Sequence, residues 1–192
     1  MKKLTRLLMA TGLMVTASAA SAHAGHDAGT GFTSGLLHPM LGLDHLLVMA
    51  AIGFWSVRQS ATLKKGTPLF VIGGMLLGAG IAWGGLSLPG VETGIALSVL
   101  LAGILIATMA KLPTAVGGSL VAAFMVFHGF AHGAEMPAGA TLAAYLAGFS
   151  SATLGLTFFG RGLGAVMMNL DGRFGRVLGG LVAATGAVLA AA

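Results

Sequence analysis

The chain has 192 residues, of which 56% are hydrophobic and only 8% are Asp, Glu, Lys or Arg. Ordinary domains carry about 25% charged residues, so this composition excludes an ordinary soluble protein and indicates a surface that mostly faces lipid. The absence of cysteine excludes disulfides and thiolate metal sites. In so apolar a chain, the net charge of +5 does not indicate a nucleic-acid partner.

The first segment has the pattern of a secretory signal peptide. A basic start precedes a short apolar run that ends in small residues. We predict that residues 1–22 are the signal peptide, with cleavage after Ala22 or, alternatively, after Ala24. An uncleaved anchor helix is the other interpretation of this segment.

Six apolar stretches follow, each close to the roughly 20 residues that span a bilayer. They cover residues 36–57, 68–88, 92–110, 114–134, 139–160 and 174–191. Such segments must be helical, because backbone groups in hydrocarbon need hydrogen bonds within the segment. The predicted fold is therefore an all-α polytopic membrane helix bundle, in which residues 23–192 form a six-helix transmembrane domain after the signal peptide.

The basic residues predict the orientation of this bundle. In the six-helix topology, every Lys and Arg after the signal peptide falls on one side of the membrane: Arg58, Lys64, Lys65, Lys111, Arg161, Arg173 and Arg176. The positive-inside rule makes that side cytoplasmic. We therefore expect a multi-pass protein of the bacterial cytoplasmic (inner) membrane, with both mature termini on the periplasmic side.

A polar motif, HPMLGLDH, interrupts the first span. His38 is placed at the outer end of this span, and Pro39 can occupy the first turn of a helix without disrupting it. Asp44 and His45 follow about 10 Å deeper, at about 1.5 Å per residue. The seven-residue spacing puts His38 and His45 on nearly the same face of the predicted helix.

A second motif, FHGFAHGAE, lies at the end of the fourth span. His128 and His132 are one helical turn apart on one face, and Glu135 continues that face. Because the fourth span runs outward, Glu135 is expected to be outermost and His128 deepest. The two motifs therefore fall at matching depths in the outer half of the membrane.

This match predicts that the first and fourth spans pack against each other. Gly42, Gly129 and Gly133 would permit a close approach of the two backbones. His45 and His128 would then lie near enough to bind one ion.

Ionisable groups inside a membrane span are costly and usually functional. Imidazoles and carboxylates without thiolates suit nickel, cobalt, zinc or copper. The candidate metal ligands are His38, Asp44, His45, His128, His132 and Glu135, with the N-terminal His23 and His26 as weaker candidates. A single buried histidine is more often a hydrogen-bonded packing residue, but the two clusters together favour a metal or proton function.

The two motifs, in this order, resemble those of the HupE/UreJ family, which we write as H-P-x-x-G-x-D-H and F-H-G-x-A-H-G-x-E. They correspond to residues 38–45 and 127–135, and the signal peptide, size and helix count are also similar. The resemblance implies a nickel or cobalt permease-like protein in bacteria that make nickel hydrogenase or urease. It also implies a functional link to the maturation of those enzymes.

The leading hypothesis is a secondary transporter that imports Ni²⁺, or Co²⁺, through a His/Asp/Glu site between the first and fourth spans. The transported ion can also be Zn²⁺ or Cu by ligand chemistry, and no tightly bound cofactor and no enzymatic activity are expected. The sequence has no nucleotide-binding loop that would power transport with ATP. An intramembrane metal-dependent hydrolase and a metal sensor or metallochaperone remain as alternatives. The hydrolase lacks the HExxH motif, because Gly129 stands where that motif has Glu.

A further hypothesis concerns the two halves of the bundle. The first span enters from outside and the fourth runs toward it, so spans one to three and four to six can form inverted repeats, as in many carriers. Sequence support is thin, because the two histidine motifs share little beyond a leading His.

Overall fold

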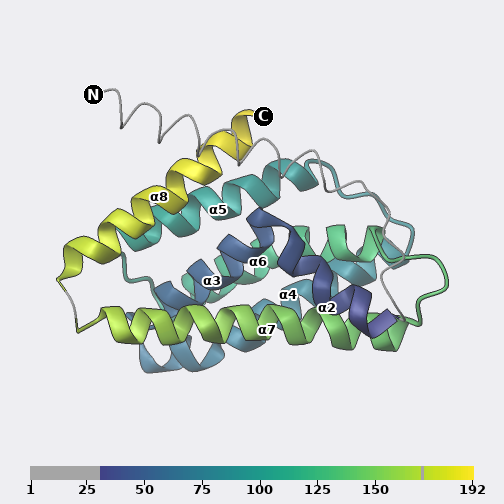
Figure 1. The fold of residues 1–192 in the computed structure, drawn as a ribbon, viewed down its shortest axis with the longest axis horizontal. Coiled ribbons are helices and arrows are strands. Elements are labelled where there is room, and N and C mark those ends of the chain that lie inside the picture. The colour runs from purple at the N-terminus through teal and green to yellow at the C-terminus, as the bar shows by residue number, and fades with distance from the viewer. Residues whose placement is uncertain (1–30, 170) are drawn as a thin grey trace.

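The computed structural model describes residues 31–169 and 171–192. Within these ranges all regular elements are α-helices, which confirms the all-α class (Figure 1). They are α2 (Gly31–Leu41), α3 (Leu43–Ser56), α4 (Ala61–Trp83), α5 (Val91–Ala107), α6 (Thr114–Ala134), α7 (Leu142–Met167) and α8 (Gly172–Ala191). The predicted signal peptide, residues 1–22, and the weaker candidates His23 and His26 lie outside the described residues.

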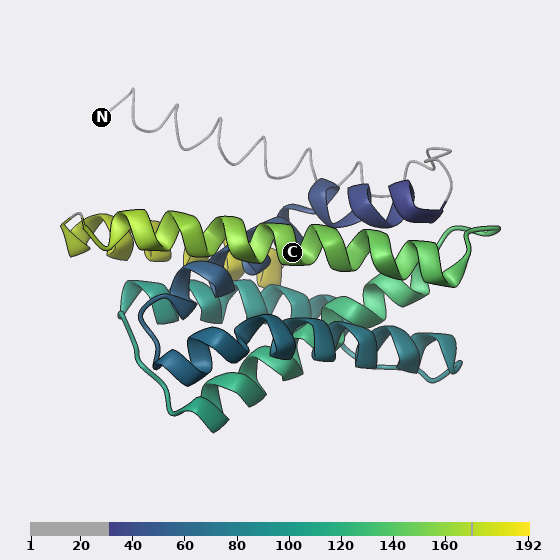
Figure 2. The same ribbon diagram turned by 90° about the horizontal axis from the view of Figure 1, so that it is seen from below.

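Each helix packs mainly against one partner. The consecutive helices α2 and α3 run along α7, α4 packs against α6, and α5 packs against α8. Helices α5 and α8 lie side by side along one edge of the molecule (Figure 1), whereas α4 and α6 lie on the side opposite α2 and α7 (Figure 2). Because α3 contacts α4, α5, α7 and α8, it lies at the centre of the bundle.

Glycines allow these helix pairs to approach closely. A Cβ atom added at Gly78 of α4 would collide with the carbonyl oxygen of Val126 in α6. A Cβ atom at Gly160 of α7 would collide in the same way with the carbonyl oxygen of Ala50 in α3. Small residues thus bring the backbones into contact, as is common in membrane helix packing.

The first span is not the continuous helix predicted over residues 36–57. Helices α2 and α3 meet at an angle of 81°, and the break falls at Gly42, whose backbone is extended (φ −84°, ψ 117°). The Asp44 carboxylate accepts a hydrogen bond of 2.7 Å from the backbone N–H of His45. This bond satisfies one of the free N–H groups at the start of α3. Pro39 lies near the end of α2, not in the first turn of a long helix.

The predicted polar loop over residues 58–67 is mostly helical. Helix α4 begins directly after Ser60, whose hydroxyl caps the first turn. Pro68 therefore lies inside the helix, where it has no N–H to donate to the carbonyl of Lys64. Arg161 of α7 replaces that donor with a hydrogen bond of 2.6 Å to the Lys64 carbonyl oxygen. The prediction of a loop failed because the replacement donor comes from a distant helix, which the local sequence does not show.

The other span boundaries agree to different extents. The predicted span 114–134 coincides with α6, whereas the span predicted over residues 139–160 continues as α7 to Met167. The loop predicted over residues 161–173 is correspondingly shorter. A charged residue does not end this helix, because the Arg161 guanidinium donates to acceptors on α3 and α4.

The described residues support a multi-pass membrane protein with four or five candidate spans. Helices α4, α6, α7 and α8 are each long and apolar enough to cross a bilayer, and the bent pair of α2 and α3 adds a fifth if it is one span. Helix α5 is apolar but has only 17 residues. At about 1.5 Å per residue it is shorter than a hydrocarbon core of roughly 30 Å. The predicted count of six spans therefore stays a prediction.

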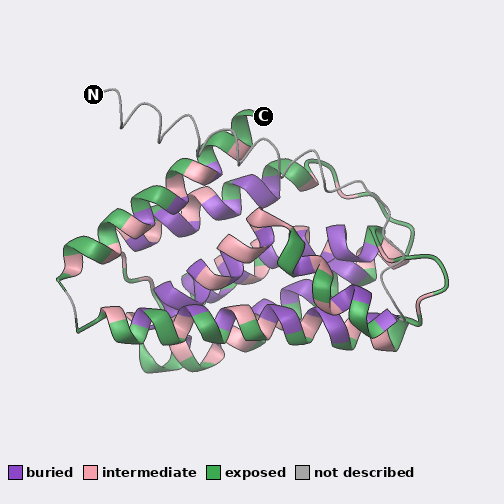
Figure 3. Cartoon of the chain, in the orientation of Figure 1, coloured by how far each residue is buried: buried purple, intermediate pink, exposed green. Residues whose placement is uncertain are grey.

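Burial follows the pattern expected of a bundle in lipid. Buried residues face the helix contacts and exposed residues cover the outside (Figure 3). Many of the exposed residues are large and apolar, such as Leu69, Phe159 and Leu181, which are 74%, 66% and 63% exposed. Many exposed large apolar side chains are typical of a lipid-facing surface.

Candidate metal centre

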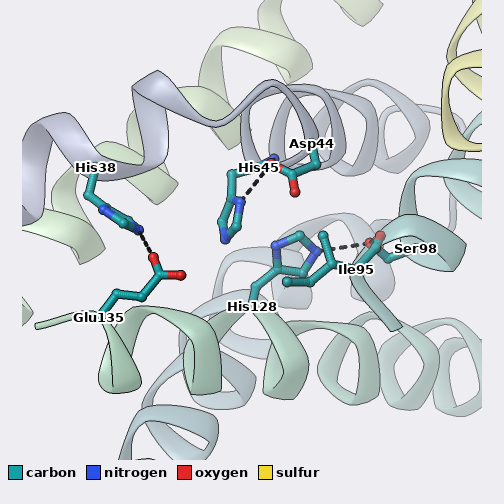
Figure 4. Close-up of polar contacts among 7 residues, drawn as sticks. All are labelled: His38, Asp44, His45, Ile95, Ser98, His128 and Glu135. Carbon is teal, nitrogen blue, oxygen red and sulfur yellow. Dashed lines mark hydrogen bonds and ion pairs between the residues drawn. The ribbon is translucent and has the colours of Figure 1, made fainter. Parts of the chain in front are cut away.

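The two polar motifs meet inside the bundle. All of the main candidate ligands lie in one region, between α2 and α3 on one side and the end of α6 on the other (Figure 4). His38 belongs to α2, Asp44 and His45 to the first turn of α3, His128 and His132 to α6, and Glu135 to the residue that directly follows α6.

Four of these residues form what we call the imidazole row. In order, its members are His38, His132, His45 and His128. The ring centroids of His132 lie 4.9 Å from His38 and 4.8 Å from His45, and His45 lies 4.6 Å from His128. The pairs meet edge to face, and the His132 ring also stacks on Phe149 at 5.2 Å and 5°. The stacking orients the His132 ring in this structure.

One end of the row reaches the protein surface and the other is closed. The His38 and Glu135 side chains are 33% and 55% exposed, and His38 Nε2 lies 2.8 Å from Glu135 Oε2. His45 is buried, and His128 and His132 have no exposed surface. The row therefore leads from an accessible polar pair into the core.

Asp44 makes a second contact beside its hydrogen bond to the backbone N–H at the start of α3. Its Oδ1 atom also lies 2.9 Å from His45 Nδ1. A carboxylate oxygen accepts, so the ring proton of neutral His45 is placed on Nδ1 and the lone pair on Nε2. A carboxylate that holds one imidazole nitrogen in this way is typical of metal-binding histidines.

A further polar residue, Ser98 of α5, contacts the imidazole row, although it belongs to neither motif. Its hydroxyl oxygen lies 2.9 Å from His128 Nε2, and its side chain is buried. The only sequence signal is a single hydroxyl in an otherwise apolar part of α5, where a polar group needs a partner. Nothing in the sequence indicates that His128 is that partner.

Several ring nitrogens in the row have no hydrogen-bond partner within the described residues. They are His45 Nε2, His128 Nδ1 and both nitrogens of His132. Buried polar atoms without partners are rare, so these positions suit a ligand. When each nitrogen lies about 2 Å from a shared ion, two imidazole centroids are roughly 4.5–6 Å apart. The centroid distances in the row fall within that range.

The donor atoms are not yet arranged for coordination. Among the described residues, no three His, Asp or Glu side chains are placed to hold a metal ion as they stand. Binding of one ion by the central imidazoles therefore requires side-chain rotations.

The predicted close approach of the first and fourth spans is wrong. Gly129 packs against Met75 and Gly133 against Ala79, both on α4. Gly42 instead lies beside the side chains of Asp44 and His45 in the first turn of α3. Neither α2 nor α3 is among the helices packed closely on α6. The two motifs meet through their side chains, because the imidazoles occupy the space between the helices.

The fold and the site together define a class of protein: a polytopic helical membrane protein with a cluster of histidines and carboxylates between its helices. The chain belongs to the HupE/UreJ family, since the model of the family described as HupE / UreJ protein matches residues 11–189. It is 39% identical to Protein HupE of Rhizobium leguminosarum bv. viciae over 188 residues, which cover 97% of this chain and 96% of the relative. No solved structure is significantly similar to this chain.

Proposed function

We propose that this protein is a secondary transporter that imports a divalent metal ion, nickel or alternatively cobalt, across the bacterial cytoplasmic membrane. The observation that carries the proposal is the imidazole row, which leads from an exposed polar pair to buried nitrogens that have no hydrogen-bond partner among the described residues. The choice of nickel comes from the family resemblance, which also implies a link to hydrogenase or urease maturation. The chain acts without a tightly bound cofactor and is not an enzyme.

The exposed pair receives the ion. Glu135 supplies negative charge at the open end of the row, and His38 supplies the first imidazole nitrogen. The incoming cation displaces the hydrogen bond between these two side chains. Since both groups are partly exposed, the ion keeps part of its water shell at this stage.

The buried imidazoles then replace water. His132, His45 and His128 present nitrogens along the row that have no hydrogen-bond partner in residues 31–169 and 171–192. Imidazole is a favoured ligand for nickel and cobalt. Neutral imidazoles leave the charge of the ion uncompensated in a medium of low dielectric. Asp44, which contacts His45, provides a carboxylate beside the buried imidazoles.

Uptake of radioactive nickel into proteoliposomes tests the proposal. We expect saturable uptake by the purified protein and loss of uptake in His128→Ala. Ser151→Ala, which changes an exposed hydroxyl on α7, is the matched control and should transport normally.

Two results would contradict import, and a third would contradict the imidazole row as its passage. Tight nickel binding without flux would indicate a sensor or metallochaperone. Cleavage of a lipid or peptide would indicate a metal-dependent hydrolase. Equal uptake by the native protein and His128→Ala would show that the imidazole row is not the passage for the ion.

A further inference from the structure

The hydrogen bond between Ser98 and His128 joins α5 to the imidazole row. Ser98 Oγ lies 2.9 Å from His128 Nε2, and both side chains are buried (Figure 4). A hydroxyl can donate one proton and can also accept, whereas neutral imidazole has one N–H and one nitrogen lone pair. The direction of this bond therefore decides which His128 nitrogen carries the proton.

A second contact of Ser98 determines that direction. Its hydroxyl oxygen lies 2.5 Å from the backbone carbonyl oxygen of Ile95, one helical turn earlier. A carbonyl has no proton to give, so the hydroxyl proton lies between these two oxygens. Ser98 can then only accept from the ring, and the Nε2–H of His128 is the donor.

We propose that Ser98 is a positioning residue for metal binding: it holds His128 as the Nε2–H tautomer, so that Nδ1 is the atom that binds the ion. This inference rests on the proposed function. His128 Nδ1 is buried and has no hydrogen-bond partner within the described residues, as an open ligand position requires. When Nδ1 binds the ion, the opposite nitrogen keeps its hydrogen bond to Ser98.

Asp44 has the corresponding effect on His45, but on the other nitrogen. It accepts from His45 Nδ1 and leaves Nε2 with the lone pair. The neighbouring rings of His45 and His128 are thus held in opposite tautomers. In each ring, the nitrogen that has no partner in the described part of the chain is the one without a proton. The wrong tautomer of His128 would direct an N–H at the ion and remove a ligand.

The tautomer can be measured without metal. The protein is labelled with ¹⁵N-histidine, reconstituted in nanodiscs and studied by long-range ¹H–¹⁵N correlation in mildly alkaline buffer. Comparison with the spectrum of His128→Gln assigns the His128 signals. We expect the Nε2–H form alone for His128. Detection of the Nδ1–H form as the main species would overturn the inference.

Three variants test the function of the hydroxyl. Ser98→Ala should give a mixture of His128 tautomers and weaken nickel affinity about tenfold, as loss of an outer hydrogen bond does in other metal sites. Ser98→Thr keeps a hydroxyl and should retain the native tautomer and most of the affinity. Ser34→Ala removes a buried serine that donates to the carbonyl of Gly31, three residues earlier, and it should change neither measurement.

The outcomes separate this inference from the proposed function. If Ser98→Thr behaves like Ser98→Ala, the effect belongs to packing and the positioning function is rejected. If Ser98→Ala does not fold, the tautomer of the native protein still decides. Failure of the native protein to bind nickel, with His128 in the Nε2–H form, would reject the proposed function while the hydrogen-bond assignment stands.

Discussion

Each imidazole of the row is held by a different neighbouring side chain. The neighbours are Glu135 for His38, Phe149 for His132, Asp44 for His45 and Ser98 for His128. Three of them are polar and one is aromatic, so the rings are oriented while ring nitrogens stay available. Such outer contacts commonly decide metal affinity as much as the ligands do.

His45 and His128 should contribute to one ion. Because their rings are 4.6 Å apart, we expect His45→Ala and His128→Ala to reduce nickel affinity to a similar extent, and the double variant to lose little more. Calorimetric titration of the three purified variants measures this. Simple addition of the two losses would mean independent sites and would exclude a shared ion.

Glu135 should affect capture more than equilibrium binding. Its carboxylate is 55% exposed, so it attracts the cation before water is removed. We expect Glu135→Gln to slow nickel uptake several-fold at low nickel concentration, most strongly at low salt. Its equilibrium affinity should fall less than that of His128→Ala. Asp171→Asn, which changes another exposed carboxyl, is the control. An uptake rate that does not depend on salt would argue against this effect.

At the scale of single helices, the break at Gly42 and the contacts between helices determine where the site residues lie. At the break at Gly42 the chain turns by 81°, and both α2 and α3 still pack against α7. The histidines on the two helices therefore reach the same row from different directions. Arg161 has a comparable function for α4, since it satisfies the carbonyl that Pro68 leaves without a donor.

Packing of α3 on α7 should control the position of His45. A Cβ at Gly160 would collide with the Ala50 carbonyl, whereas one at Gly155 would meet nothing within 4 Å. We expect Gly160→Ala to destabilise the protein by about 1–3 kcal/mol, as overpacking usually does, and to weaken nickel binding. Gly155→Ala on the same helix should leave both unchanged. Thermal unfolding measures the stability, and equal stability of the two variants would contradict the packing.

At the scale of the whole molecule, the helix pairing fits the inverted-repeat hypothesis. With α2 and α3 counted together as the first span, the first packs on the fifth, the second on the fourth, and the third on the sixth. Exchanging the first three spans with the last three leaves this set of pairs unchanged. The symmetry is incomplete. The exchange would turn the contact between the first and third spans into one between the fourth and sixth, but α3 contacts α5 closely whereas α6 and α8 are not a closely packed pair.

The orientation is a separate prediction for the whole molecule. Since the chain has no cysteine, single cysteines at two exposed sites report it cleanly. Lys65→Cys near the start of α4 and Ser87→Cys in the turn after it should react with an impermeant reagent from opposite sides of the membrane. Labelling of Lys65→Cys in intact spheroplasts would show that the orientation is opposite to the predicted one.

The sequence alone determined the helical membrane class, the family and the residues of the polar cluster. The hydropathy of a segment depends on its own residues alone, so a run of about 20 apolar residues is enough to predict a membrane span. The spacing within each motif is equally local, so the shared face of His128 and His132 could be predicted. The matching depths of the two motifs followed from the order of the spans.

Only the tertiary structure decided how the polar groups are satisfied. Ser98 and His128 are 30 residues apart, and Arg161 and Lys64 are 97 apart. Neither hydrogen bond leaves a local pattern, because its formation depends on which helices become neighbours. The same reason explains the error at Pro68, whereas the hydrogen bond beside Gly42 is local and joins Asp44 to His45. A helix tolerates a break or a proline where a distant side chain, or a carboxylate beside the break, supplies the missing hydrogen bonds.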